Sequence, residues 1–428
     1  MKTTKLALSL LLLGSAAAPL AAAQSADVSG DITVTAWDVA AEALQGTVEG
    51  FNQEYPNVNV TVENLGNQQV YDRGLAGCAA GGADLPDVYA VENNEAEVFW
   101  NRFPGCFTDL NTMGAGDLRD QFPDFKWTEL GVGDQVFAVP WDSGPVVTFY
   151  RRDLYEQAEI NVDEIETWDD FIAAGQKLDE ATGAKMMWFD FSDDGVWRQL
   201  ANQNGCFYFD DAGENVTANQ PGCVAAMETM KKLYDSGVVE IVDWNGAIQA
   251  IKNDTLAGAV FGGWYVGTIQ GNAPEQEGNW GVYPMPASEA GGVRAANLGG
   301  SALAIPASTD NPEAAMAFVT YALATTQGQV GMLENFGLVP SYLPALEDPY
   351  IQEGVPYWGD QAIWQDILAT LGEIPQARGT QYFQEARQIV TNTLSQYLSE
   401  GAYEDAQTAM DDAAQQIAGA TGLPLAGQ

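Results

Sequence analysis

One stretch of this 428-residue chain, residues 135–155, constrains the fold more than any other and reads QVFAVPWDSGPVVTFYRRDLY. An apolar, β-like run stops at Pro140, and the polar and aromatic loop WDSG follows at residues 141–144. A second β-like run, residues 146–150, leads into charged residues that can open a helix. Two strands joined by a short loop with an indole and a carboxylate suit a hinge between two lobes, facing a cleft.

The first residues have the composition of a secretory signal peptide. Lys2 and Lys5 precede an apolar run at residues 6–13, and the small-residue stretch AAPLAAAQ follows. This order is typical of export signals, and the apolar run is too short for a mature membrane anchor. We expect a signal peptide at 1–23, cleaved after Ala23, and a secreted, periplasmic protein. Because no cysteine lies at the cleavage junction, no lipid anchor is expected.

Length and charge narrow the class of protein further. The mature chain would have about 400 residues, more than one hydrophobic core normally serves, so two lobes are expected. Asp and Glu number 59 against 17 Lys and Arg, for a net charge of −42. Such a polyanion would repel nucleic acid, which excludes that partner. The acidic residues are scattered along the whole chain, which favours a solvated acidic surface over attraction of a cationic ligand such as a polyamine.

The chain has four cysteines, Cys78, Cys106, Cys206 and Cys223. An even number in an exported chain indicates disulfides, and four cysteines allow three connectivities. We expect the pairs that are close in sequence, Cys78–Cys106 and Cys206–Cys223. The second pair would close a turn-rich loop. A metal or thiol site is the competing interpretation, but the spacings are too wide for a C-x-x-C motif.

The chain contains no histidine, which limits the catalytic chemistry available to it. A Ser-His-Asp triad, a Cys-His dyad and a histidine-ligated zinc are excluded. Neither a phosphate-binding G-x-x-x-x-G-K-[ST] loop nor a G-x-G-x-x-G motif after a strand is present. No cofactor is therefore expected. A glycosidase needs only two carboxylates, so that enzyme class stays open as an alternative.

Apolar and polar patterning predicts alternating strands and helices. The pattern runs strand, helix, strand, helix, strand at residues 32–36, 41–54, 58–62, 68–80 and 88–91. Such alternation indicates an α/β fold with mostly parallel sheets and helices on both faces.

Three further boundaries can be predicted. Thr167 and Asp170 fit a capping box at the start of a helix. Asn311 fits an N-cap followed by proline at the first helical position. The final stretch, about 382–418, looks helical with a break near Gly401.

Six segments in a fixed order carry a family resemblance that spans about residues 30–420. They read DITVTAWD, GFNQEYPNVNVTVE, LPDVYAVEN, TWDDFIAAGQKL, FGGWYVG and LGGSALAIPASTDNPEAAMAFVTYAL. Together with the hinge-like stretch they resemble the extracellular solute-binding proteins of bacterial ABC importers, specifically the sugar-binding, maltose-binding-protein-like group. The resemblance implies a two-lobed periplasmic-binding-protein fold of type II, each lobe being a mostly parallel sheet flanked by helices. It also implies a monomeric, non-enzymatic protein that closes on a ligand and is recognised by membrane permease subunits.

In this family neither lobe is a continuous segment of the chain. The resemblance implies an N-terminal lobe of residues 27–140 with 299–326. It implies a C-terminal lobe of residues 141–298 with 327–420.

A sugar ring has apolar C–H faces and a rim of hydroxyls, so aromatic rings and carboxylates, amides or arginine suit it. Trp264 in FGGWYVG resembles the family's stacking tryptophan and has two glycines beside it. Trp37 and Asp38 end the first strand, and Glu92 and Asn93 follow a later one, where open α/β sheets place ligands.

The remaining candidates lie in loops and at the proposed crossings between lobes. For Asp142, the alternative to ligand binding is that its side chain caps a turn. Gly300 and Ser301 would offer backbone N–H groups to the ligand at the second crossing between the lobes. The simpler interpretation of Arg378 is that it pairs with an acidic side chain at the surface. The full set of these candidates is Trp141, Asp142, Asp193, Trp244, Gly300, Ser301, Tyr342 and Arg378.

Three hypotheses remain open at this point. The first is a carbohydrate-binding importer subunit, supported by the ordered segments and the signal peptide. The second is a polyamine- or cation-binding subunit of the same fold, supported by the acidic charge. The third is a secreted glycosidase dependent on carboxylates. The sequence does not identify the sugar, its length or the permease partner.

Overall fold

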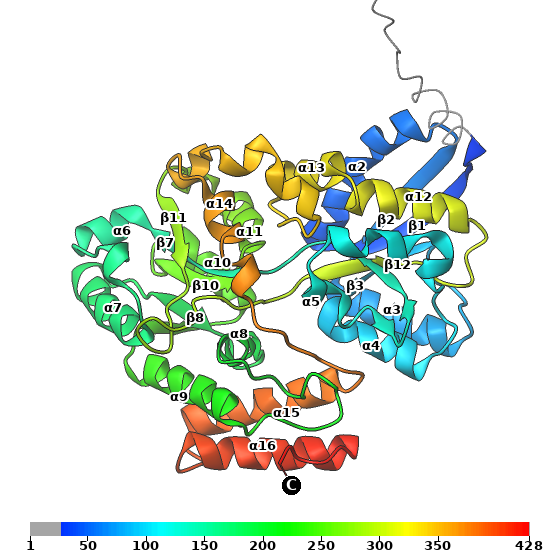
Figure 1. Ribbon diagram of the computed structural model, residues 1–428. Coiled ribbons are helices and arrows are strands. Elements are labelled where there is room, and N and C mark those ends of the chain that lie inside the picture. Colours follow the sequence, from blue (N-terminus) through cyan, green and yellow to red (C-terminus); the bar gives the residue numbers. More distant parts are fainter. Residues whose placement is uncertain (1–26, 428) are drawn as a thin grey trace, which may run out of the picture.

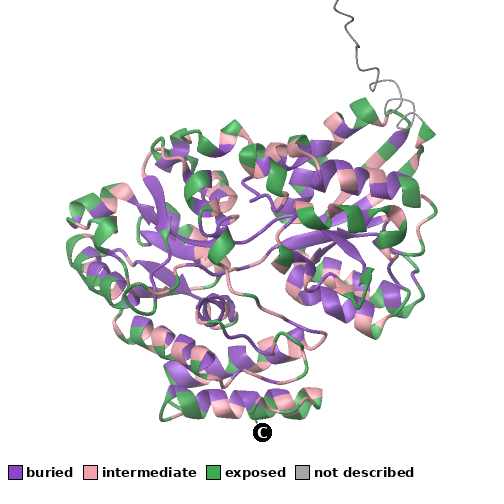
Figure 2. Ribbon diagram, in the orientation of Figure 1, coloured by how far each residue is buried: buried purple, intermediate pink, exposed green. Residues whose placement is uncertain are grey.

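The computed structural model describes residues 27–427, so the predicted signal peptide lies outside the described part of the chain. The chain forms two lobes, each with a central sheet and helices on both faces (Figure 1). Figure 2 shows buried residues concentrated in the strands and on the inner faces of the helices. The predicted α/β, two-lobed architecture is confirmed.

The first lobe is built on a five-stranded sheet in the order β2-β1-β3-β12-β6. The strands are β1 (Gly30–Trp37), β2 (Val58–Leu65), β3 (Val88–Glu92), β6 (Ala138–Pro140) and β12 (Ser301–Ala304). Strand β1 pairs in parallel with β2 and β3, whereas β12 pairs antiparallel with both β3 and β6. Four strands therefore share one direction and β12 opposes them, in keeping with the predicted, mostly parallel sheet.

Helices cover both faces of this sheet and create two apolar layers. One layer lies under α2 (Asp38–Glu54), α12 (Pro312–Leu323) and α13 (Thr326–Phe336), and the other under α3 (Asn67–Ala79) and α4 (Asn93–Arg102). Since both faces are buried, β3 can be a continuous apolar run. The lobe is completed by a short helix, α5 (Asp124–Trp127), and a small hairpin of β4 (Gly131–Val132) and β5 (Gln135–Val136).

The second lobe has the same plan. Its strands are β7 (Val146–Arg151), β8 (Met187–Phe189), β9 (Val239–Ile241), β10 (Gly258–Gly262) and β11 (Trp280–Pro284). Strand β7 lies between β10 and β11 and opposes both, while β8 and β9 are parallel. A parallel bridge between Lys185 and Leu256 connects the β8 segment to the β10 segment. Again one strand, β7, opposes the others.

The helices of the second lobe pack in two clusters around its sheet. They are α6 (Arg152–Gln157), α7 (Trp168–Thr182), α8 (Gly195–Gln203), α9 (Pro221–Asp235), α10 (Trp244–Lys252), α11 (Tyr265–Asn272), α14 (Ile363–Leu368), α15 (Phe383–Ser395) and α16 (Ala406–Thr421). A π-helical turn at Gln396–Glu400 ends at Gly401, whose φ of 66° lies in the left-handed region that glycine favours. The predicted break near Gly401 is confirmed.

Short 3₁₀ helices connect the larger elements. They are Leu110–Met113, Ala115–Gln121, Val162–Glu164, Pro274–Gln276, Leu343–Glu347, Pro349–Gln352, Pro356–Trp358 and Leu371–Glu373. Among residues 27–427, no helix combines the length and the apolar character that crossing a bilayer requires.

Of the two helix N-termini predicted from capping residues, one is confirmed in full and the other only in part. Thr167 and Asp170 form the expected capping box at the start of α7, each side chain accepting a hydrogen bond from the other residue's N–H. Pro312 is the first residue of α12, as predicted, but the Asn311 side chain does not cap the helix. It donates to the carbonyl of Asp31 at 3.0 Å instead, because β1 passes directly beside it.

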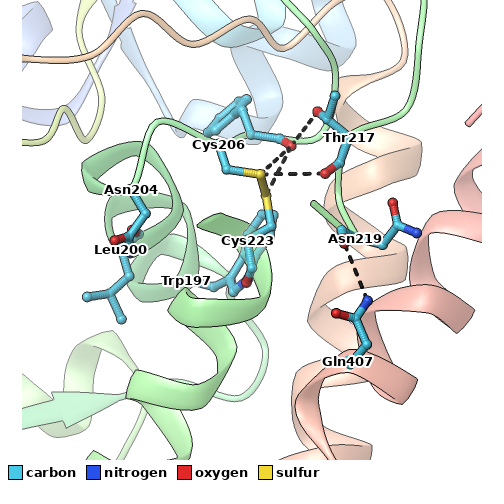
Figure 3. Close-up of a disulfide and its surroundings, with 9 residues drawn as sticks. Trp197, Leu200, Asn204, Cys206, Thr217, Asn219, Cys223 and Gln407 are labelled. Atoms are coloured by element: carbon cyan, nitrogen blue, oxygen red, sulfur yellow. Dashed lines mark hydrogen bonds between the residues drawn. A yellow bond between two sulfur atoms is a disulfide. The ribbon is translucent and has the colours of Figure 1, made fainter. Parts of the chain in front are cut away.

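Both predicted disulfides are present, Cys78–Cys106 and Cys206–Cys223. The second closes the loop before α9, and the indole of Trp197 donates to the carbonyl of Cys223 at 3.4 Å (Figure 3). The loop is also attached to α16, where Gln407 donates to the carbonyl of Asn219 at 3.4 Å.

Three chain segments cross between the lobes side by side. The first crossing contains Ser143 and Gly144, the second contains Leu298, and the third contains Val339. The N–H of Ser143 donates to the carbonyl of Val339 at 2.9 Å, which joins the first crossing to the third. The N–H of Leu298, in the second crossing, donates to the carbonyl of Gly144 at 2.8 Å. Helix α13 packs on α2 of the first lobe. The part of the chain that packs on the first lobe therefore continues beyond residue 326, the predicted limit of that lobe. The exact limits of the lobes remain a prediction.

Candidate ligand-binding site

Two neighbouring cavities lie between the lobes beside the crossing segments. Cavity A has a volume of about 490 Å³ and cavity B about 280 Å³. Both are lined by residues of both lobes and share Asn67, Glu92, Trp244, Trp264 and Gly299. A smaller cavity C, of about 50 Å³, adjoins cavity B at Asn94, Arg198, Leu298 and Gly299.

Two indole rings of the second lobe separate cavities A and B. Trp244, the first residue of α10, stacks on Trp264 with ring centroids 6.1 Å apart and planes 28° apart. Trp264 follows β10, and its Nε1 donates to the carbonyl of Leu298 at 2.9 Å. A Cβ atom on Gly262 or Gly299 would lie 2.6 or 2.9 Å from that Nε1, so glycine at both positions makes room for the ring.

A second aromatic pair continues this wall into cavity B. The rings of Trp188 and Phe261 stack with centroids 5.8 Å apart and planes 23° apart. The two pairs meet, since the Phe261 and Trp264 centroids are 5.2 Å apart. Aromatic faces of this kind suit the apolar C–H faces of a ring-shaped ligand.

The first lobe supplies polar groups at the carboxyl ends of its parallel strands. Trp37 ends β1 and Asp38 follows it, Asn67 lies just after β2, and Glu92 ends β3. The amide of Asn67 donates to the Glu92 carboxylate at 3.3 Å. Asp38 has a φ of 41°, an uncommon conformation that directs the chain from β1 into α2. These strand ends place three polar side chains on one wall of cavity A.

The crossing segments form the base of cavity A. The Asp142 carboxylate accepts hydrogen bonds from the N–H of Ser301 at 2.8 Å and from its hydroxyl. Lys126, which is 2% exposed, donates from Nζ to the carbonyl of Asp142 and to Oδ1 of Asn93, both at 2.6 Å. Burial lowers the pKa of Lys126 to about 8, although Asp142 and Glu129 oppose this shift. Gly300, with a φ of 97°, brings the backbone close to the ammonium.

The second lobe supplies a cluster of charged side chains in cavity B. The wholly buried Asp194 accepts hydrogen bonds from Nε of Arg198 at 2.9 Å and from the hydroxyl of Tyr208. Arg387 of α15 pairs with Asp193. Burial opposes ionisation of Asp193, but Arg198 and Arg387 outweigh it and lower the pKa of this carboxyl. The cluster therefore holds two arginines against the cavity.

Glu92 faces this cluster across cavity B. Burial raises the pKa of Glu92, while Arg198 and Arg387 of the second lobe act in the opposite direction. One carboxylate of the first lobe and two guanidinium groups of the second thus meet at the cavity. The site offers aromatic faces together with hydrogen-bond acceptors and donors from both lobes.

Most of the residues predicted from the sequence line cavities A and B. They are Trp37, Asp38, Glu92, Asp142, Asp193, Trp244, Trp264, Gly300 and Ser301. Asn93 lines only cavity C, and its side-chain oxygen accepts a hydrogen bond from Lys126. Asn93 therefore positions Lys126 and does not line cavity A or B. Their roles as ligand contacts remain predictions.

Three predicted residues do not line cavities A, B or C. Trp141 is 1% exposed and its ring lies in the core of the first lobe. The hydroxyl of Tyr342 donates to Gln121 at 2.9 Å. Arg378 pairs with Glu97 at 2.5 Å; Glu97 is a buried acid of the opposite lobe, not the surface acid of the simpler interpretation, so this arginine joins the two lobes.

The sequence analysis missed several lining residues, among them Asn67, Asp190, Arg198 and Arg387. Asn67 could have been found by the rule that selected Trp37, because it also follows the carboxyl end of a parallel strand. No comparable signal marks the two arginines beyond the scarcity of basic residues in the chain. Among residues 27–427, no group of three or more Cys, Asp or Glu is placed to hold a metal ion.

Two lobes, three crossing segments and a shared cavity define a solute-binding protein of the two-lobed, type II fold. A family model for bacterial extracellular solute-binding proteins matches residues 31–329. The chain belongs to this bacterial extracellular solute-binding protein family, whose members bind solutes and are not enzymes.

Individual relatives match nearly the whole chain. The lactose-binding protein of Rhizobium radiobacter is 29% identical over 381 residues, 85% of this chain and 88% of that protein. An arabinooligosaccharide-binding protein of Halalkalibacterium halodurans is 23% identical over 389 residues, 87% of this chain and 86% of that protein. The solved binding protein of B. animalis subsp. lactis Bl-04, in complex with beta-1,6-galactobiose, has a TM-score of 0.78 at 22% identity. That match covers 92% of this chain and 97% of the other.

Proposed function

We propose that this protein is the carbohydrate-binding subunit of an ABC importer. It captures a mono- or oligosaccharide between its lobes by hinge closure and delivers it to membrane permease subunits. The observation that carries the proposal is the stacked pair Trp244 and Trp264, which lies between two cavities lined by acids and amides. Aromatic faces bind the C–H faces of a sugar, and the polar groups bind its hydroxyls.

The proposed contacts follow from this arrangement. Trp244 and Trp264 stack on sugar rings, and Trp37 adds a third aromatic face in cavity A. Asp38 and Glu92 accept hydrogen bonds from hydroxyls on the first lobe's side. Arg198 and Arg387 donate hydrogen bonds from the second lobe, while Asp193 and Asp194 neutralise their charge.

The relatives support a carbohydrate ligand. The names of two of them specify lactose and arabinooligosaccharides, and the solved relative holds a disaccharide, beta-1,6-galactobiose. The two alternatives are not favoured. A polyamine would have to approach the guanidinium groups of Arg198 and Arg387 in cavity B. A glycosidase would depart from a family of binding proteins.

The cellular setting belongs to the same proposal. Residues 1–23 act as the signal peptide, and the mature protein diffuses in the periplasm without a lipid anchor. It acts as a monomer, with lobes of residues 27–140 with 299–326 and 141–298 with 327–420, except that α13 (Thr326–Phe336) packs on the first lobe. The family match to extracellular binding proteins supports export.

A calorimetric titration tests the proposal. The chain lacking residues 1–23 is titrated with lactose, arabino-oligosaccharides, beta-1,6-galactobiose and spermidine, with tryptophan fluorescence recorded in parallel. Saturable one-to-one binding of a sugar without product formation is expected, together with its loss in Trp264→Ala. Tyr342→Phe, outside the cavities, is the matched control and keeps the affinity. Binding of spermidine alone, or hydrolysis of a sugar, would overturn the proposal.

A further inference from the structure

A second set of contacts joins the lobes away from the three crossing segments. It connects α4 and Glu129 of the first lobe with residues 378–385 of the second, and we call it the latch. Arg378 pairs with Glu97 at 2.5 Å, and Arg102 pairs with Glu385 at 2.7 Å. The amide of Gln384 donates to Glu95.

The backbone takes part in the latch as well. The N–H of Gly379 donates to Oε1 of Glu129 at 2.6 Å. A Cβ atom at Gly379 would lie 2.4 Å from the carbonyl oxygen of Asn94 in the first turn of α4. The two lobes are therefore in direct backbone contact at this position.

The latch buries carboxylates of the first lobe. Glu95, Glu97 and Glu129 are 6%, 3% and 8% exposed, and each accepts a hydrogen bond from the second lobe. Arg378 supplies one cation, but Glu95 and Glu129 receive only neutral donors across the gap. Burying a carboxylate without a paired cation disfavours its charged form.

The surroundings of Glu95 favour its protonated form. Burial raises the pKa of Glu95 to about 8; Glu92 adds to the shift, and Arg387 and Arg198 oppose it. Tyr71 and Tyr89 also face Glu95.

Glu129 lies in a comparable setting. Burial raises its pKa to about 7, the N–H of Gly379 and the cations Lys126 and Arg378 oppose the shift, and Glu97 adds to it.

The latch is continuous with the ligand cavity. Glu92, which lines cavities A and B, lies three residues before Glu95, so both face the second lobe. Gln384 and Arg387 are likewise three residues apart on α15, and Arg387 lines cavity B. A ligand between Glu92 and Arg387 therefore binds beside the first latch contact.

We propose that the latch is a proton-sensitive closing device, and that Glu95 and Glu129 hold the lobes together when protonated and release them when ionised. The inference rests on the hinge closure of the proposed function. When the lobes separate, water reaches both carboxyls, and each pKa returns toward its ordinary value of 4.5. The closed form then binds more protons between about pH 5 and pH 8, so a lower pH favours closure.

Small-angle scattering of the ligand-free mature chain tests the latch without any sugar. The radius of gyration of the wild type is expected to increase between pH 6 and pH 9. The variant E95Q/E129Q carries neutral, isosteric side chains and is expected to keep the smaller radius at both values. Arg378→Met, which leaves Glu97 without its cation, is expected to have the larger radius already at pH 6.

The control is E313Q/E347Q, which neutralises two exposed carboxylates outside the latch and should follow the wild type. A radius that is the same at pH 6 and pH 9 in a wild type with unchanged circular dichroism would overturn the latch. So would an E95Q/E129Q variant that expands as the wild type does. Because no sugar is present, failure of sugar binding and failure of the latch are separate results.

Discussion

The carboxylate of Asp142 accepts two hydrogen bonds from Ser301, one from its N–H at 2.8 Å and one from its hydroxyl. The two residues are 159 positions apart and belong to different crossings between the lobes. The crossings are therefore joined by side-chain as well as backbone contacts. Lys126 extends the network by donating to the carbonyl of Asp142.

Removing the Asp142 carboxylate should lower stability. Asp142→Ala leaves the buried N–H and hydroxyl of Ser301 without their acceptor, which costs about 1–3 kcal/mol. Asp142→Asn retains one oxygen acceptor and should cost less. Urea unfolding of both variants measures the difference. Equal stability of the alanine variant and the wild type would show that the Asp142–Ser301 pair contributes nothing.

Lys126 should give the protein a distinctive stability profile in alkali. Its pKa is lowered from 10.5 to about 8 in the folded chain, so between these values the unfolded chain binds more protons. Stability from this group therefore rises with pH over that interval, by up to about 3 kcal/mol. The free energy of unfolding of Lys126→Met, subtracted from that of the wild type at each pH, isolates this rise. A flat difference between pH 8 and pH 10.5 would contradict the assignment.

Two neighbouring acids, Asp193 at cavity B and the buried Asp194, should differ strongly in their effect on stability. Asp194→Ala leaves Arg198 and Tyr208 without their buried partner and should cost about 3–5 kcal/mol. Asp193 is partly exposed, so Asp193→Ala should cost less than about 1 kcal/mol. Thermal unfolding of the pair makes the comparison. Similar losses in both variants would show that burial does not distinguish them.

Gly379→Ala should hold the lobes apart at the latch. The added methyl group would lie 2.4 Å from the carbonyl oxygen of Asn94, and backbone on the α4 side has little freedom to move. A larger radius of gyration than that of the wild type at pH 6 is expected. Gly372→Ala is the matched control, because a Cβ atom there has no neighbour within 4 Å. Identical radii for both variants would contradict the predicted clash.

Much of the first lobe could be predicted because its signals are local. Apolar runs that end at proline, glycine or charged residues located β1, β2 and β3 to within a few residues. Two cysteine pairs close in sequence were also predictable. Trp37 and Glu92 were found at the cavity because strand ends have a fixed relation to the edge of a sheet.

The residues that escaped prediction depend on partners far away in the chain. Lys126 lies 175 positions from Ser301, whose carbonyl it approaches at 3.3 Å, and no local pattern links them. Arg387 meets Asp193 across 194 positions. Trp141 illustrates the opposite error, since an indole in a hinge-like loop turned inward to the core. Burial of a single side chain depends on tertiary packing, which periodicity does not reveal.

The position of β12 has a consequence for the order in which the chain can fold. Strand β12 lies between β3 and β6, so β6 has no hydrogen-bonded neighbour in that sheet before β12 arrives. Residues 301–304 leave the ribosome more than 150 residues after Pro140, and the whole second sheet is made in between. The first sheet therefore stays incomplete through most of synthesis, and its non-local pairing makes folding slow. A delay of this kind keeps a newly made chain unfolded until residues far along the sequence have been made.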